Sequence, residues 1–293
     1  MADMGSLKYE LTDETKTLYD GTVLHRIRAL RDIQIYNVLA GDFGGWIENE
    51  DNLAQNGEAW VLGPAQVYGN ARVYGNAGVF GDAQVYGSAR VYGNARVYGD
   101  AQVYCDAKVH GRARVYDNAW VHGRARVYGN ARVYDNAWVH GRARVYGNAW
   151  VYGNAGVFGD AQVYGRGMVA GAAQISGAAQ VSSVNDYAVY KNTWSSGRFV
   201  TWTRFDNQWQ AGCFRGTGDE LVAKAYKDSP LSGKCYETIV RAQEAIEAAI
   251  AEAKGSGDGC GIGDGSGYGY GGGGGNGSGF GDGCGNGSGG RGV

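Results

Sequence analysis

The stretch YDNAWVHGRARVYGN occupies residues 116–130 and recurs without change at residues 134–148, eighteen positions further along the chain. Within it a shorter motif, A-x-V-(Y/F/H)-G-(N/D), repeats at every sixth position, so three short units make one long unit. An aliphatic residue occupies every sixth position from Val61 to Val181, which gives 21 consecutive matches. This regularity predicts a repeat fold, and the exact copy indicates that three units form one structural period.

Each six-residue unit has the pattern of a short strand followed by a corner. Because the period is even, the alanine and the valine of a unit point to one side, and the residues next to the valine point to the other. Alanine stands two residues before nearly every valine, with Gly167 as the exception. The small apolar side is therefore the interior. The Gly-Asn and Gly-Asp pairs suit a bend that needs a positive φ angle.

Three such sides close one triangular coil, and 21 units predict about seven coils. The alanines and valines of successive coils are expected to stack in a narrow dry core. The predicted fold class is mainly β: a single-stranded parallel β-helix with a cap at each end.

The repeat resembles that of the bacterial hexapeptide-repeat proteins, in which an aliphatic residue follows a small one by two positions. The resemblance covers residues 59–183 and implies a left-handed β-helix, although parallel crossovers are otherwise almost always right-handed. Tyrosine directly after the valine departs from the family pattern. The segment LHRIRAL…AGDFGGWIENEDNL, between Leu24 and Leu53, resembles uncharacterised bacterial and prophage proteins labelled as transferases or polymer-forming proteins.

Four segments follow from these patterns. Residues 1–58 form an N-terminal β cap, residues 59–183 the hexapeptide-repeat β-helix, and residues 184–254 an α+β C-terminal cap. The C-terminal cap is expected to contain a β-hairpin turning at Asp206-Asn207 and helices near 219–227 and 236–254. In residues 255–293 glycine alternates with other residues, which favours a flexible tail; an assembly or receptor-binding tip is the alternative.

Composition narrows the class of protein. The 53 glycines and two prolines follow no three-residue period, which excludes collagen. No apolar run approaches the roughly 18 residues of a membrane span, and the N-terminus lacks the apolar core of a signal peptide. A cytoplasmic or virion-associated protein without membrane insertion is expected. The five cysteines form no C-x-x-C pair, so reduced thiols are the interpretation.

Charge is unevenly distributed along the chain. Residues 1–60 contain 5 Lys/Arg against 11 Asp/Glu, a balance of −6, whereas residues 61–183 contain 12 against 6, a balance of +6. The acidic start and basic repeat region could attract an anionic partner to the solenoid or promote contacts between copies.

The outward residues differ among the three faces of the predicted coil. The second face has a basic residue before the valine in five coils, and the first face has glutamines and then two tryptophans. Aromatic residues follow the valine on all three faces, where stacking can stabilise a sheet or offer a surface to sugars, bases or a protein. The candidate binding residues are Arg72, Arg90, Lys108, Arg126, Arg144, Tyr74, Tyr92, Tyr128, Tyr146, Trp120 and Trp138.

No catalytic residue, cofactor or metal site is predicted. His122 and His140 lie one coil apart on the first face, but no third ligand continues the series. The acyltransferases of the resembled family depend on a histidine and on loops that interrupt the coils. Here no insertion breaks the period between Val61 and Val181, which leaves little concavity for a substrate.

The sequence thus favours a non-enzymatic structural or interaction protein, of phage or prophage origin by the resemblance. Its rigid surface would serve self-assembly or binding of a protein partner, and a trimer is the form expected if the chain forms an oligomer, although no outer face is apolar enough to require one. A hexapeptide-repeat acyltransferase is the first alternative. A module that binds nucleic acid or another polyanion through the Arg/Tyr face is the second.

Overall fold

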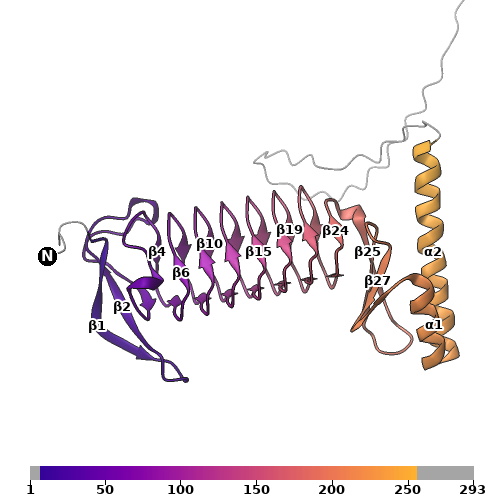
Figure 1. Cartoon of the computed structure of the whole chain (residues 1–293), viewed down its shortest axis with the longest axis horizontal. Helices are drawn as coiled ribbons and strands as arrows, with labels where there is room; N and C mark the ends of the chain where they lie inside the picture. Colours follow the sequence, from indigo (N-terminus) through magenta and orange to yellow (C-terminus); the bar gives the residue numbers. More distant parts are fainter. Residues whose placement is uncertain (1–6, 256–293) are drawn as a thin grey trace, which may run out of the picture. The chain divides into compact units, whose positions relative to one another are not determined.

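The structure, a computed structural model, describes residues 7–255. It is mainly β, with parallel coils stacked in sequence order between β4 and β24 (Figure 1). The chain divides into two compact units, Met1–Ala245 and Ile246–Val293, and the solenoid with the capping strands belongs to the first. The glycine-rich segment 255–293, predicted to be a flexible tail, lies outside the described residues except for Gly255.

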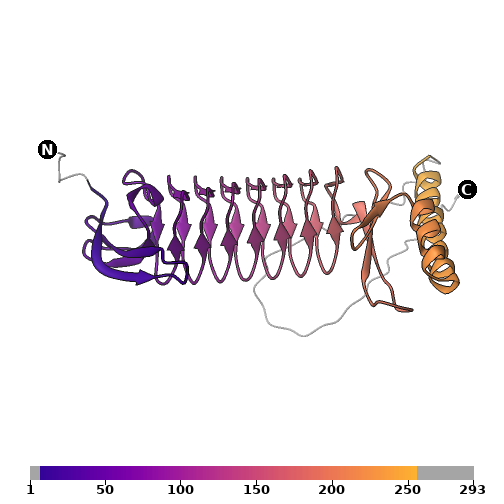
Figure 2. The same cartoon turned by 60° about the horizontal axis from the view of Figure 1, so that its bottom comes forward.

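Three parallel sheets form the solenoid, and each pairs residues one coil apart, such as Arg90 with Lys108. The strands of one sheet lie side by side along the stack (Figure 2). The first face is β5 (Gln66–Val67), β8 (Gln84–Val85), β11 (Gln102–Val103), β14 (Trp120–Val121), β17 (Trp138–Val139), β20 (Gly156–Val157) and β23 (Gln174–Ile175). The second face is β6 (Arg72–Val73), β9 (Arg90–Val91), β12 (Lys108–Val109), β15 (Arg126–Val127), β18 (Arg144–Val145), β21 (Gln162–Val163) and β24 (Gln180–Val181). The third face is β4 (Trp60–Val61), β7 (Gly78–Val79), β10 (Arg96–Val97), β13 (Arg114–Val115), β16 (Arg132–Val133), β19 (Trp150–Val151) and β22 (Met168–Val169).

The interior consists of the repeated alanines and valines, as predicted. Ala113, Val115 and their counterparts in the other coils have no exposed surface and form one continuous cluster. Because the core is only one alanine and one valine thick per side, it has no space or partner for a charge.

Val115→Asp should lower the free energy of unfolding by about 3–5 kcal/mol or prevent folding, because the carboxylate would be buried without a partner. Urea unfolding followed by circular dichroism measures the change. The control is Arg114→Asp, which places the same charge on the exposed neighbour and should cost far less. Equal stability of the two variants would contradict the assignment of inside and outside.

The corners need a left-handed backbone, which explains the recurring glycine. Gly99, for example, has φ +70°, and a Cβ there would lie 2.8 Å from the amide nitrogen of Asp117 at the same corner of the next coil. Three corners carry another residue in the same conformation: Cys105, Asp117 and Asp135, with φ 55–57°. The carboxylate of Asp135 accepts a hydrogen bond from Gly153 N at 3.0 Å, which offsets part of the strain.

Cys105→Gly should raise the free energy of unfolding by about 1 kcal/mol, because it removes the strain of a side chain in the left-handed region. Asp135→Gly should raise the free energy of unfolding by less, because this substitution also removes the hydrogen bond from Gly153 N. Equilibrium urea unfolding of both variants tests the difference. A destabilised Cys105→Gly protein would mean that the thiol makes a compensating contact.

The stack begins earlier than the sequence indicates. In β3 (Phe43–Ile47), Ile47 pairs in parallel with Val67, and Leu53 forms a parallel bridge with Val73. These residues form a first turn, so the solenoid has about eight turns where the six-residue period predicted seven. The turn escaped the pattern because Leu53 and Val61 are eight residues apart, two more than the regular spacing.

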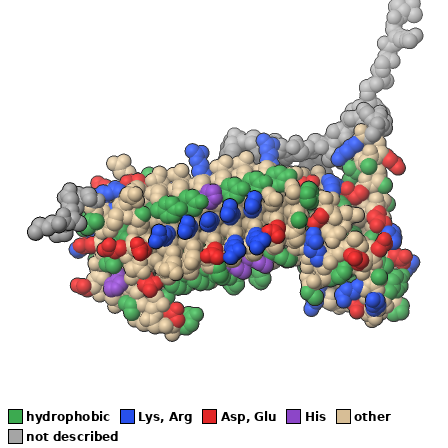
Figure 3. Space-filling view, in the orientation of Figure 1, with side chains coloured by type: hydrophobic (Ala, Val, Ile, Leu, Met, Phe, Trp, Pro, Cys, Tyr) green, Lys and Arg blue, Asp and Glu red, His purple; other side chains and the backbone are tan. Residues whose placement is uncertain are grey.

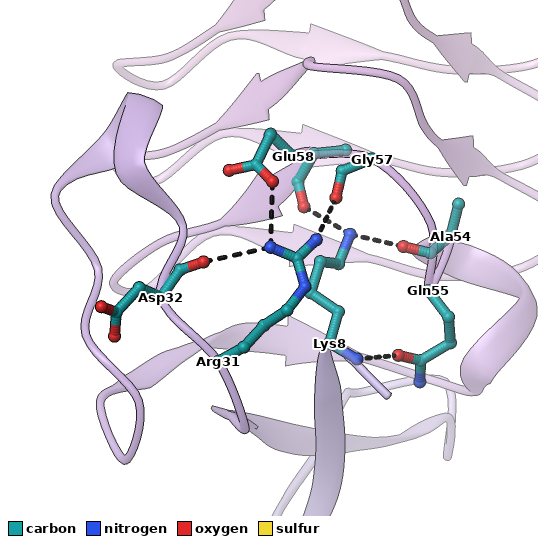
Figure 4. Close-up of polar contacts among 8 residues, drawn as sticks. Lys8, Arg31, Asp32, Ala54, Gln55, Gly57 and Glu58 are labelled. Carbon is teal, nitrogen blue, oxygen red and sulfur yellow. Dashed lines mark hydrogen bonds and ion pairs between the residues drawn. The ribbon is translucent and has the colours of Figure 1, made fainter. Parts of the chain in front are cut away.

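The N-terminal cap supplies hydrogen-bond donors. The amides of each coil donate hydrogen bonds to the carbonyls of the following coil, as from Arg90 N to Ala107 O at 2.9 Å. The carbonyls of the first turn therefore have no preceding coil to donate to them. Lys8 Nζ donates to Ala54 O and, at 2.7 Å, to Ala59 O, and Arg31 donates to Gly57 O at 2.7 Å (Figure 4). Burial and the nearby Arg31 lower the pKa of Lys8 to about 8.

An antiparallel extension completes this cap. Strands β1 (Tyr9–Thr17) and β2 (Val23–Ala29) continue the sheet of the first face through β3. The short helix η1 (Gln34–Tyr36) connects β2 to β3, and η2 (Glu50–Asn52) follows β3. The outer strand β1 is rich in charged and exposed residues toward its end. Charged side chains on an edge strand discourage further strand addition.

The C-terminal cap supplies acceptors. The amides of the last coil have no following coil whose carbonyls could accept from them. Side-chain oxygens take this place: Gln174 N donates to Thr201 Oγ1 at 2.9 Å, and Ser182 N donates to Asp186 Oδ2 at 2.7 Å. The elements are η3 (Val184–Asp186), β25 (Tyr187–Lys191), β26 (Phe199–Thr203), β27 (Gln208–Ala211), β28 (Phe214–Gly216), α1 (Gly218–Asp228) and α2 (Pro230–Gly255).

The predicted hairpin at Asp206-Asn207 and the two predicted helices are present in this cap. Within residues 7–255, Cys105, Cys213 and Cys235 form no disulfide. Within residues 7–255, no helix is both long enough and apolar enough to cross a membrane.

Candidate binding surface

The second face presents two parallel rows of side chains. The strand pattern places one outward residue on each side of a buried valine, as Arg90 and Tyr92 flank Val91. The basic ladder is Arg72, Arg90, Lys108, Arg126 and Arg144. The aromatic ladder beside it is Tyr74, Tyr92, His110, Tyr128, Tyr146 and Tyr164. Figure 3 shows the blue row of cations next to the green row of rings, which one purple histidine interrupts.

The basic ladder holds like charges in direct register. Successive members pair across adjacent strands, about 4.8 Å apart, where like charges repel. Four of the five are exposed and Lys108 is partly exposed. Within residues 7–255 none of the five forms an ion pair with a carboxylate. A row of anionic groups laid along the face would relieve this repulsion.

The aromatic ladder offers ring edges and hydroxyl groups to a partner. Neighbouring rings are stacked with centroids 4.7–5.4 Å apart and interplanar angles of 2–12°. Because the four inner rings each lie between two others, their faces are used within the ladder, and a base or sugar has little face to stack on there. Burial, and then the neighbouring tyrosines, raise the pKa of Tyr146, whose hydroxyl already donates to Gln162 Oε1 at 3.2 Å within the chain.

Further arginines adjoin the ladder at the corners, and the sequence reasoning missed them. Arg124 and Arg142 precede Arg126 and Arg144 by two residues and are exposed. Arg124 makes an exposed ion pair with Asp106 at 3.8 Å, which contributes little. The one-coil offset between Arg124 and Arg142 was the signal that could have identified them.

The third face carries a second row, Arg96, Arg114 and Arg132, which the sequence reasoning also missed. One member of this row already has a ring partner in the chain: the Arg132 guanidinium lies 4.9 Å from the centre of the Trp150 ring. The second face is therefore the better candidate for an external anion.

Acidic residues of the N-terminal cap border the start of the basic ladder. A shallow hollow of about 570 Å³ is lined by Arg72, Tyr74 and Arg90 on one side and by Glu50 and Asp51 on the other. These carboxylates would oppose an approaching anion at this end. An anionic partner is therefore attracted most strongly to the central and later part of the ladder, from Lys108 to Arg144.

The two predicted tryptophans lie apart from the basic ladder, on the first face. Trp120 and Trp138 stack with centroids 5.8 Å apart and an angle of 11°. Trp120 is 38% exposed and Trp138 is 52% exposed. The eleven predicted binding residues therefore divide between two surfaces, nine on the second face and these two on the first.

His122 and His140 stack face to face on the first face, with ring centroids 5.0 Å apart and an angle of 4°. Parallel stacked rings direct their nitrogen lone pairs alongside one another, so the pair does not converge on one ion. Within residues 7–255 there is no cluster of three or more His, Cys, Asp or Glu side chains suited to a metal. Burial lowers the pKa of both histidines, and His140 lowers that of His122 further.

Stability should therefore fall as the pH drops below the ordinary histidine value of 6.5. The unfolded chain takes up protons there before the folded state does, so stability present above pH 6.5 is lost on acidification. The double variant His122→Tyr/His140→Tyr, which continues the ladder with its commonest residue, should lose less stability on acidification than the wild type. Melting temperatures at pH 7.5 and 5.5 test this; an equal loss in both proteins would contradict it.

The stacked coils define a β-solenoid repeat protein. A family model described as the YdcK beta solenoid repeat matches residues 65–81, 71–87, 89–104, 125–141 and 143–159, all within the coils. The chain is similar to that repeat over these segments, which cover the basic ladder apart from Lys108. A comparison with curated proteins finds no match.

Proposed function

We propose that this chain is a non-enzymatic interaction protein whose solenoid holds the basic ladder rigid against a partner. The observation that carries the proposal is the straight row of exposed like charges, unpaired with carboxylates of residues 7–255 and held in register by coil-to-coil pairing. Rows of like charge cost stability, so a partner that neutralises them gains both the attraction and the relief of repulsion.

The first partner to consider is a protein surface rich in carboxylates, including that of a second copy. Residues 1–60 carry 11 Asp/Glu against 5 Lys/Arg, whereas the repeat region carries an excess of cations. Opposite charges on the two regions favour contact between the cap of one copy and the coils of another. Self-assembly through the ladder is therefore part of the proposal.

The triple variant Arg90→Gln/Lys108→Gln/Arg126→Gln should fold with unchanged or slightly higher stability, because the three side chains point outward and repel one another. If copies assemble through the ladder, the wild-type mass from light scattering exceeds that of the 31.1 kDa chain at low salt and falls as salt rises. The triple variant should stay monomeric at both salt concentrations.

The matched control is Arg96→Gln/Arg114→Gln/Arg132→Gln, which removes three charges from the third face. It should assemble as the wild type does. Equal loss of assembly in both variants would show that assembly depends on the overall charge of the chain, and it would overturn the assignment to the second face. A large drop in melting temperature of the second-face variant would show that the ladder lies in a packed interface.

A linear polyanion is the second candidate partner, favoured by the regular spacing of the cations. For a single-stranded nucleic acid, each phosphate contact contributes about 0.7 to the slope of log affinity against log salt. Removing three ladder cations should lower this slope by about 2, measured by fluorescence anisotropy with a labelled oligothymidylate. The third-face control should keep the wild-type slope; absence of wild-type binding would leave a protein partner.

The resemblance also carries an alternative activity, acyl transfer, and a phage or prophage origin with a cytoplasmic or virion-associated location. The unbroken coils between residues 59 and 183 support a surface function over a catalytic one. Transfer of an acyl group from an acyl-carrier thioester by the purified chain would favour the enzyme instead.

A further inference from the structure

The fifteen-residue stretch VYGNAGVFGDAQVYG occurs twice without change, at residues 73–87 and 151–165. The start of the second copy lies thirteen six-residue units after the start of the first, which is not a whole number of coils. The copies therefore lie on different faces: Gly78 belongs to β7 of the third face and Gly156 to β20 of the first. In both, glycine replaces the outward side chain that precedes the buried valine.

The first copy is occupied by an aromatic ring of the same chain. Tyr36 from η1 lies directly over Gly78, so close that a Cβ on this glycine would be 2.6 Å from the hydroxyl oxygen and 2.8 Å from a ring carbon. The Tyr36 hydroxyl donates to Asn76 O at 2.8 Å. On the adjacent strands, Gly78 pairs with Trp60 and Arg96, and Trp60 is completely buried.

The second copy has the same arrangement without the inserted ring. Gly156 pairs with Trp138 on one side and Gln174 on the other, which again gives tryptophan, glycine and a long polar residue in order along the face. Trp138 is 52% exposed, in contrast to the buried Trp60. The position over Gly156 is covered by the end of the Gln174 side chain, whose Oε1 would be 2.6 Å from an added Cβ.

We propose that the surface at Gly156 is a docking site for a tyrosine side chain of a protein partner. The Gln174 amide swings aside, the phenol ring lies over Gly156 against Trp138, and its hydroxyl donates to Asn154 O, the counterpart of Asn76 O. Binding covers part of the exposed indole, whereas Trp60 next to the first copy is already buried within the chain, with the Tyr9 ring edge-on to it at 6.2 Å. The site is on another face from the basic ladder and does not depend on it.

The occupied copy is what favours a tyrosine over other flat rings. The same fifteen residues already accept a phenol, including its hydrogen bond to a corner carbonyl. Tyrosine is also enriched among the residues that dominate protein interfaces, since it combines a large rigid ring with a polar end.

The test is titration of N-acetyl-tyrosinamide into the whole chain, followed by the NMR signal of the Trp138 indole N–H. Wild type should show a saturable shift of this signal. Gly156→Gln, which restores the commonest residue of this position on the first face, should fold normally and weaken binding at least tenfold. Equal binding by wild type and Gly156→Gln, or no binding by wild type, would overturn the proposal.

Two further measurements separate a tyrosine site from a sugar site and test whether the first copy accepts a free phenol. Methyl glucoside in place of the tyrosine derivative should not shift the signal; an equal or larger shift would show a sugar site and overturn the proposal. Tyr36→Ala vacates the first copy, and p-cresol should then raise its melting temperature. If that variant does not fold, the comparison of wild type with Gly156→Gln still decides.

The identical sequences also provide a matched pair for stability. Gly78→Gln must displace the Tyr36 ring and should lower the melting temperature, whereas Gly156→Gln moves only a flexible amide and should change it little. Equal destabilisation by the two substitutions would mean that the position over Gly156 is as tightly filled as that over Gly78, and would overturn the proposal.

Discussion

The directional hydrogen bond from each coil to the next is the interaction on which the molecule depends. Every strand donates its amides forward, as from Tyr92 N to Val109 O, so the stack has free carbonyls at its start and free amides at its end. Because buried backbone groups must be satisfied, the two caps need opposite chemistry. The N-terminal cap supplies the cationic donors Lys8 and Arg31, and the C-terminal cap supplies oxygens such as Thr201 Oγ1.

The same constraint shapes the surface. Strict register from coil to coil places identical side chains above one another, which creates both the favourable ring stacks and the unfavourable row of cations. Ring stacking stabilises the sheet by a few tenths of a kcal/mol or more per pair, and the repulsion between cations opposes it. The core of alanine and valine tolerates this conflict because it is uniform in every coil. A surface of this kind is rigid, and it binds without first having to become ordered.

The six-residue period was enough to predict the parallel coils, the buried alanines and valines, and the residues that point outward. The handedness came only from the resemblance. The same period also placed the basic residues and the two tryptophans on different faces. Two features were beyond the pattern. The first turn was hidden by the irregular spacing of Leu53 and Val61, and the ring of Tyr36 over Gly78 is a contact between residues far apart in the chain.

The repeated stretch that contains Gly78 and Gly156 shows how such a molecule can change during evolution. Duplication of one whole coil lengthens the solenoid and moves a surface motif along the same face. Duplication of a single six-residue unit, or of thirteen such units, also turns the motif onto another face while leaving every valine inside. Tandem duplication can therefore relocate an intact motif around the axis without altering the core, so that a contact first formed within the chain becomes available to another molecule.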